Sequence, residues 1–200
     1  MSQKTLFQIV WDFVGIPFRL ILFDQQWLPR FGWTTLDDER LNAVYPYIQG
    51  RLLDIGAGPN VLVKRYGNGV GVDVHDWGGG ALVVENSAHL PFDNQSFGTI
   101  TLIACLNHIP NRQDVLYEAK RLLKPDGQII ITMINPLLGD VGHWLWWYGE
   151  DKHRGGMKDG ETGGLWSHEL IAMCQAAGFA LHLHRRFVYK MNNLYVFKCT

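Results

Sequence analysis

The sequence has few cysteines and almost no excess charge, and each shortage excludes a class of protein. Cys105, Cys174 and Cys199 are odd in number and contain no C-x-x-C pair. A disulfide framework is therefore not expected, no metal-ligand spacing is present, and we predict no metal and a cytoplasmic location. Eighteen basic and nineteen acidic residues leave a net charge of −1, which lacks the basic footprint of a nucleic-acid-binding protein.

The chain also lacks an uninterrupted hydrophobic segment long enough to span a membrane. Residues 6–23 are very apolar, but Asp12, Pro17 and Arg19 interrupt them, which excludes a spanning helix. Asp12 and the lack of an A-x-A site also argue against a secretory signal. Two interpretations remain: a helix packed on the domain and broken near Pro17, or an interfacial helix that contacts a membrane or closes over an apolar substrate. We favour the first.

The feature around which the chain is organised is the run Leu52-Leu53-Asp54-Ile55-Gly56-Ala57-Gly58-Pro59-Asn60. A short apolar strand that passes through glycines into a helix is typical of a parallel α/β sheet. Gly56 and Gly58 let backbone N–H groups approach a ligand, and the helix N-terminus carries a partial positive charge. A dinucleotide site would need a third glycine where Val61 stands, which weakens that interpretation.

A second acidic residue, Asp73, ends the next predicted strand, residues 70–74. At about 20 residues after a glycine turn, a carboxylate accepts hydrogen bonds from the ribose hydroxyls of a nucleoside cofactor. The link 75–80 is short and rich in glycine. We therefore expect a loop there instead of a crossover helix, and a more open adenosine side.

Several motifs in order resemble the class I S-adenosylmethionine (SAM)-dependent methyltransferases. Asp54-Ile55-Gly56-Ala57-Gly58 resembles their motif I, D-x-G-x-G. Asn86-Ser87, followed by Leu90-Pro91-Phe92 and Ser96-Phe97, resembles a signature of the type 11 family, which includes the ubiquinone and menaquinone C-methyltransferases. Residues 106–110 resemble the L-H-H-I-P loop of that family, and residues 124–127 resemble its L-K-P-G-G turn.

The resemblance implies SAM as the cofactor and S-adenosylhomocysteine as its product. The cofactor site that it implies consists of Asp54, Gly56, Ala57, Gly58, Asp73, Val74, Asn86, Ser87, Ile103 and Ala104. Asn86 and Ser87 take the places that recognise adenine, and His108 or Asn107 faces the methyl-transfer site. Methyl transfer needs mainly orientation and desolvation, so a base is useful only for an acceptor of high pKa. His108 and His143 are the candidates for this catalytic role.

The predicted fold is α/β: a Rossmann-like, doubly wound, seven-stranded, mostly parallel sheet with an antiparallel last strand. N-terminal helices and a cap insertion after strand five complete it. Thr35 is predicted to begin a helix and Ser167 to cap the last one. We expect a single domain with an N-terminal helical segment (1–48), a SAM-binding core (49–135), a substrate cap (136–165) and a C-terminal helix with a strand pair (166–200).

The predicted function is transfer of a methyl group from SAM to a small-molecule acceptor. The apolar N-terminus and three tryptophans within residues 144–147 favour a lipid-linked or aromatic acceptor. Two alternatives stay open: an NAD(P)-linked oxidoreductase, and a catalytically inactive SAM-binding module that serves in interactions. The sequence does not indicate the oligomeric state.

Overall fold

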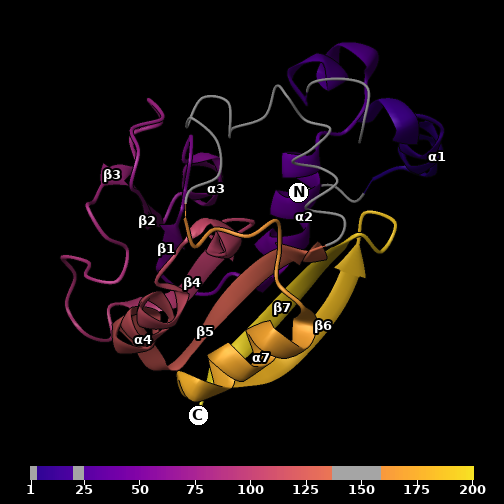
Figure 1. Cartoon of the computed structure of the whole chain (residues 1–200). Coiled ribbons are helices and arrows are strands. Elements are labelled where there is room, and N and C mark those ends of the chain that lie inside the picture. The colour runs from indigo at the N-terminus through magenta and orange to yellow at the C-terminus, as the bar shows by residue number, and fades with distance from the viewer. Residues whose placement is uncertain (1–3, 20–24, 137–158) are drawn as a thin grey trace.

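A seven-stranded sheet forms the centre of the computed structural model, which describes residues 4–19, 25–136 and 159–200 (Figure 1). The strand order is β3-β2-β1-β4-β5-β7-β6. The bounds are β1 Leu52–Ile55, β2 Gly69–Asp73, β3 Leu82–Val83, β4 Phe97–Ile103, β5 Leu123–Ile134, β6 Phe179–Phe187 and β7 Asn192–Cys199. Strands β1 to β5 pair in parallel, while β7 runs antiparallel to both β5 and β6. The predicted fold is confirmed, and it differs from the 3-2-1-4-5-6 order of dinucleotide-binding folds.

Helices cover both faces of the sheet, because successive strand residues point to opposite sides. Leu53 packs in the cluster under α4 and α7, whereas the adjacent Leu52 packs in the cluster under α2 and α3. Figure 1 shows α4 and α7 together on one face. Within the described residues, the helices are α1 Leu6–Val14, η2 Gln25–Phe31, α2 Leu36–Val44, η3 Tyr45–Tyr47, α3 Val61–Tyr66, η4 Leu106–His108, α4 Arg112–Leu122 and α7 Ser167–Ala176.

The ends of two helices test the capping predictions. The Thr35 hydroxyl accepts a hydrogen bond from the Asp38 N–H at 3.0 Å, so α2 begins as predicted. The prediction for the last helix was wrong, because Trp166 is the N-cap residue and the Glu169 carboxylate accepts from its N–H at 3.0 Å. The Ser167 hydroxyl instead pairs with the Tyr195 hydroxyl at 2.6 Å, which secures α7 to the sheet.

The predicted turn at residues 124–127 lies inside strand β5. Leu123 pairs with Phe97, and pairing resumes in a shifted register with Gln128 opposite Thr99. The four intervening residues therefore form an irregularity within the strand. Such an irregularity is one of the few positions in a sheet that tolerates a proline, here Pro125.

The carboxyl ends of β1, β2 and β4 meet at one edge of the sheet, where three loops converge. The glycine turn after β1 is held to β2, since the N–H groups of Gly56 and Ala57 donate to the Val72 carbonyl. The link between β2 and β3 is a loop without a helix, as predicted. This edge is where doubly wound sheets bind ligands.

Candidate cofactor and active site

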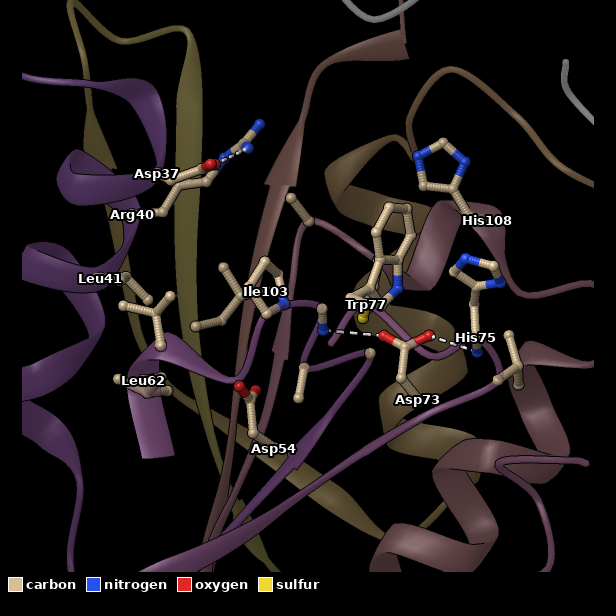
Figure 2. A pocket seen from close by; sticks show the side chains of 18 of the residues that line it. Asp37, Arg40, Leu41, Asp54, Leu62, Asp73, His75, Trp77, Ile103 and His108 are labelled. Atoms are coloured by element: carbon tan, nitrogen blue, oxygen red, sulfur yellow. Dashed lines mark hydrogen bonds and ion pairs between the residues drawn. The ribbon is translucent and has the colours of Figure 1, made fainter. Parts of the chain in front are cut away.

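A pocket with a cavity volume of about 400 Å³ opens at this edge of the sheet (Figure 2). Its size is within the range of small-molecule sites. The predicted cofactor residues that line it are Asp54, Gly56, Ala57, Gly58, Asp73, Val74, Ser87, Ile103 and Ala104. His108 also lies in the lining. Residues that are distant in sequence but predicted to act together therefore share one cavity.

The two glycines of the turn make room for different groups: Gly56 for the side chain of Cys105, and Gly58 for a ligand. A Cβ at Gly56 would lie 2.7 Å from the Cys105 Cβ, so only glycine permits this packing. A Cβ at Gly58 would meet nothing within 4 Å, and Gly58 has a φ of +51°. The backbone here thus forms an open cradle, which fits the polar end of a cofactor.

Asp73 joins the glycine turn to the next loop. One of its carboxylate oxygens accepts from the Gly58 N–H at 2.9 Å, and the other accepts from the His75 N–H at 3.0 Å. Figure 2 shows both bonds. A carboxylate offers about four lone-pair positions, so each oxygen retains capacity for a ribose hydroxyl.

Asp54 is buried beside the turn, on the strand adjacent to that of Asp73. The Thr101 hydroxyl donates to its carboxylate at 2.6 Å. Burial, reinforced by the negative charge of Asp73 and partly offset by the Thr101 hydrogen bond, raises the pKa of Asp54 to about 7. Near neutral pH this carboxyl is therefore able to gain or lose a proton in response to a charged ligand.

His108 lies at the rim of the pocket, on η4, with partners on both sides of its ring. Its Nδ1 is 3.5 Å from a carboxylate oxygen of Glu161, whose side chain is 2% exposed. Its Nε2 is 3.0 Å from the Asn107 amide nitrogen, which also donates to the Thr162 carbonyl. Because the amide nitrogen can only donate, Nε2 is the acceptor and Nδ1 carries the proton that faces Glu161.

A profile of the methyltransferase domain family matches residues 26–184, well over half of the chain. The chain belongs to the methyltransferase domain family. With the strand order of the sheet, this membership confirms the class I SAM-dependent methyltransferase predicted from the motifs, and SAM as its cofactor.

Individual relatives of this methyltransferase domain cover parts of it. The ubiquinone biosynthesis O-methyltransferase of Klebsiella pneumoniae is 33% identical over 85 residues, which are 42% of this chain and 32% of that protein. A SAM-dependent methyltransferase of Thermotoga maritima superposes with a TM-score of 0.63 at 17% identity, covering 81% of this chain and 88% of the other. The 1,6-didemethyltoxoflavin-N1-methyltransferase of Burkholderia thailandensis, solved with S-adenosylhomocysteine, gives 0.57 at 14% identity, covering 100% and 92%. The chain spans between about a fifth and two thirds of the length of the curated relatives it matches.

Sequence reasoning missed Glu161 and Trp77 of this methyltransferase. Glu161 lies in the predicted cap, and the Arg112 guanidinium holds this segment on η4 by donating to the Gly160 and Asn107 carbonyls at 2.6 and 2.9 Å. Trp77 lies in the loop that was expected to leave the adenosine side open, and its ring lines the pocket. The ring meets His75 edge-on at 4.8 Å. The one available signal for Trp77 was an aromatic residue four positions after Asp73.

Of the predicted site residues, Asn86 and His143 are not among the described residues that line the pocket. Asn86 lies outside the pocket lining, and its side-chain oxygen accepts from the Ala88 N–H at 2.9 Å and the Asn111 amide at 3.2 Å. Its role toward adenine stays a prediction. His143 and most of the predicted cap lie outside the described residues.

Proposed function

We propose that this protein transfers the methyl group of SAM to a small apolar acceptor, either lipid-linked or aromatic, in the cytoplasm. The observation that carries the proposal is the convergence of the open Gly58 cradle, the Asp73 carboxylate and the His108 ring on one pocket. The cofactor, when bound, supplies an electrophilic methyl group. The protein supplies binding, orientation and exclusion of water.

Each end of the cofactor has a group in this chain that suits it. Asp73 binds the ribose hydroxyls through its remaining lone pairs. The Trp77 ring offers a flat apolar surface to adenine, because aromatic rings and bases stack favourably. Asp54, whose pKa is raised to about 7, becomes fully ionised when a cationic amino group is bound beside it.

His108 acts as the general base when the acceptor is a hydroxyl. An acceptor hydroxyl that replaced the Asn107 amide at Nε2 would give its proton to that nitrogen, which would leave the acceptor oxygen nucleophilic. The Glu161 carboxylate, 3.5 Å from Nδ1, keeps the ring in the required tautomer and stabilises the imidazolium that forms. Glu161 is thus a positioning residue, and His108 is the catalytic one.

The test is transfer of a labelled methyl group from SAM to a panel of acceptors. The panel contains a prenylated phenol in detergent micelles, the same phenol without its chain, and a free sugar. We expect transfer to the phenols, fastest with the prenylated one, and none to the sugar. Asp73→Asn serves as the cofactor-site control and should show at least tenfold weaker SAM binding.

Two results would overturn the proposal. Binding of NAD or NADP without binding of SAM would favour an oxidoreductase. Binding of SAM without transfer to any acceptor would favour an inactive binding module. Isothermal titration calorimetry with SAM, S-adenosylhomocysteine, NAD and NADP separates these results before the acceptor panel is used.

A further inference from the structure

Helix α1 is oriented with its apolar side chains toward solvent and its one charged side chain toward the protein. Leu6 is 76% exposed, Phe7 75% and Phe13 61%, whereas Asp12 is 1% exposed. The usual arrangement for a helix on a globular domain is the reverse. Hydrophobic burial against the described part of the chain therefore does not explain why this helix is so apolar.

A polar network holds α1 in this orientation. The Asp12 carboxylate accepts from the Thr34 N–H at 2.9 Å and pairs with the Lys4 ammonium at 2.5 Å. The buried Arg19 guanidinium donates to the Asp12 carbonyl at 3.0 Å and to Glu39 on α2 at 2.8 Å. The apolar face is thus fixed outward by several charge-assisted hydrogen bonds.

Neighbouring segments extend this surface and add positive charge at its edges. Tyr189, at the tip between β6 and β7, packs edge-on against Phe13 at 5.9 Å and is followed by the exposed Lys190. On η2, the Arg30 guanidinium lies 4.2 Å from the centre of the Trp27 ring, and Trp27 is 44% exposed. The only charged residue of α1 is the buried Asp12, so the exposed face of the helix is uncharged.

We propose that α1, together with Trp27, Arg30, Tyr189 and Lys190, forms a surface that binds an anionic membrane leaflet. An uncharged apolar face bordered by amphipathic aromatic rings and by cations is the composition of an interfacial membrane-binding surface. The cations attract the negative surface potential of the leaflet. The proposed contact is peripheral, and no described helix is a candidate membrane span.

A second copy of the chain fits this surface less well. Two copies meeting through α1 would bring Arg30 and Lys190 of each to the shared interface. The exposed face of α1 offers no acidic side chain to pair with them. A membrane of anionic lipids supplies both the apolar depth and the opposite charge.

The surface is also connected to the pocket. Glu39, which Arg19 holds, belongs to α2, and other residues of α2, including Asp38 and Leu41, line the pocket. A membrane-bound α1 therefore brings one wall of the pocket close to the leaflet. Delivery of a membrane-borne acceptor to that wall rests on the proposed function, whereas the docking surface itself does not.

The test is flotation of the full-length protein with two kinds of vesicle. One kind contains phosphatidylcholine alone, and the other also contains roughly 30% phosphatidylglycerol, which gives it the negative surface charge of an anionic leaflet. We expect binding to the anionic vesicles that weakens as salt is added. The double variant Phe7→Glu/Val10→Glu alters only exposed side chains and should reduce binding at least tenfold. Arg30→Gln and Lys190→Gln should each reduce it roughly fivefold.

A matched control is Tyr117→Glu on α4, which changes a side chain that is 50% exposed outside this surface. It should bind vesicles as the wild type does. Equal vesicle binding by the wild type and the double variant would overturn the proposal. A wild-type protein that does not bind vesicles would also overturn it. In that case, a dimer that light scattering detects in the wild type but not in the double variant would assign the surface to a second copy of the chain. SAM titration of each variant is independent of these outcomes and reports separately on the proposed function.

Discussion

At the scale of single residues, the site depends on two acidic groups on adjacent strands that have different surroundings. Asp73 accepts from two backbone N–H groups, while Asp54 is buried with one hydroxyl donor. We therefore expect the two carboxyls to have different roles, Asp73 toward uncharged hydroxyls and Asp54 toward positive charge.

Asp54 is expected to make the stability of the ligand-free protein fall as pH rises. Its pKa is raised to about 7 from an ordinary value of 3.8. The stabilising contribution is therefore fully present below about pH 4 and is lost as pH rises through about 7. Relative to Asp54→Asn, the free energy of unfolding should fall by roughly 1 kcal/mol per pH unit in this window. Urea denaturation at pH 5 and pH 8 measures it, and parallel curves for the two proteins would contradict it.

His108 and Glu161 are expected to affect turnover and not cofactor binding. His108→Ala should leave the SAM dissociation constant unchanged and lower kcat by roughly a hundredfold or more with a phenol acceptor. Glu161→Gln keeps the shape of the side chain but removes the charge near Nδ1. Its kcat should fall less, and the acidic limb of its pH–rate profile should move to lower pH. An unchanged profile would assign Glu161 a purely structural role.

At the scale of elements, helix α4 positions the segment that contains the Leu-Pro-Phe motif. The Glu118 carboxylate accepts from the Leu90 N–H at 2.8 Å and from the Arg121 guanidinium at 2.6 and 2.7 Å. Arg121 in turn donates to the Phe92 carbonyl at 3.0 Å. The motif that the sequence analysis associated with the family is therefore fixed by an ion pair on a helix that follows it in the chain.

Removal of that ion pair is expected to destabilise the fold. Glu118→Ala leaves the buried Leu90 N–H without its acceptor and removes the carboxylate partner of the Arg121 guanidinium, at a cost of about 3 kcal/mol. Glu118→Gln retains an acceptor for Leu90 and should lose about half as much. Burial opposes the charge of Glu118, but the Arg121 and Leu90 hydrogen bonds outweigh it and lower its pKa. Its contribution is therefore present above about pH 4.5 and is lost as pH falls further. Thermal denaturation of the three proteins at pH 7 measures the difference, and equal melting temperatures would show that the segment is held otherwise.

Local patterns predicted those elements whose formation is decided locally. Helix α2 begins where predicted because the Thr35 hydroxyl caps it locally by accepting from the Asp38 N–H. The orientation of α1 was not predictable in this way, because periodicity shows that a face is apolar but not which way it points. The contact of Glu161 with His108 also depends on how Arg112 folds the chain back onto η4, and no local pattern encodes that.

At the scale of the whole molecule, we expect the binding of SAM and the stability of the fold to be coupled through the raised pKa of Asp54. A ligand at about a hundred times its dissociation constant stabilises the native state by roughly 2.7 kcal/mol, which corresponds to several degrees of melting temperature. SAM carries positive charge and should bind best when Asp54 is ionised, so binding near neutral pH should release a proton. At a fixed SAM concentration, the rise in melting temperature should therefore be larger at pH 8 than at pH 6. In Asp54→Asn the rise should be smaller and equal at the two pH values. If the rise in the wild-type melting temperature does not depend on pH, the cationic end of the cofactor lies away from Asp54. If the pH dependence persists in Asp54→Asn, another group of the pocket is the one that titrates.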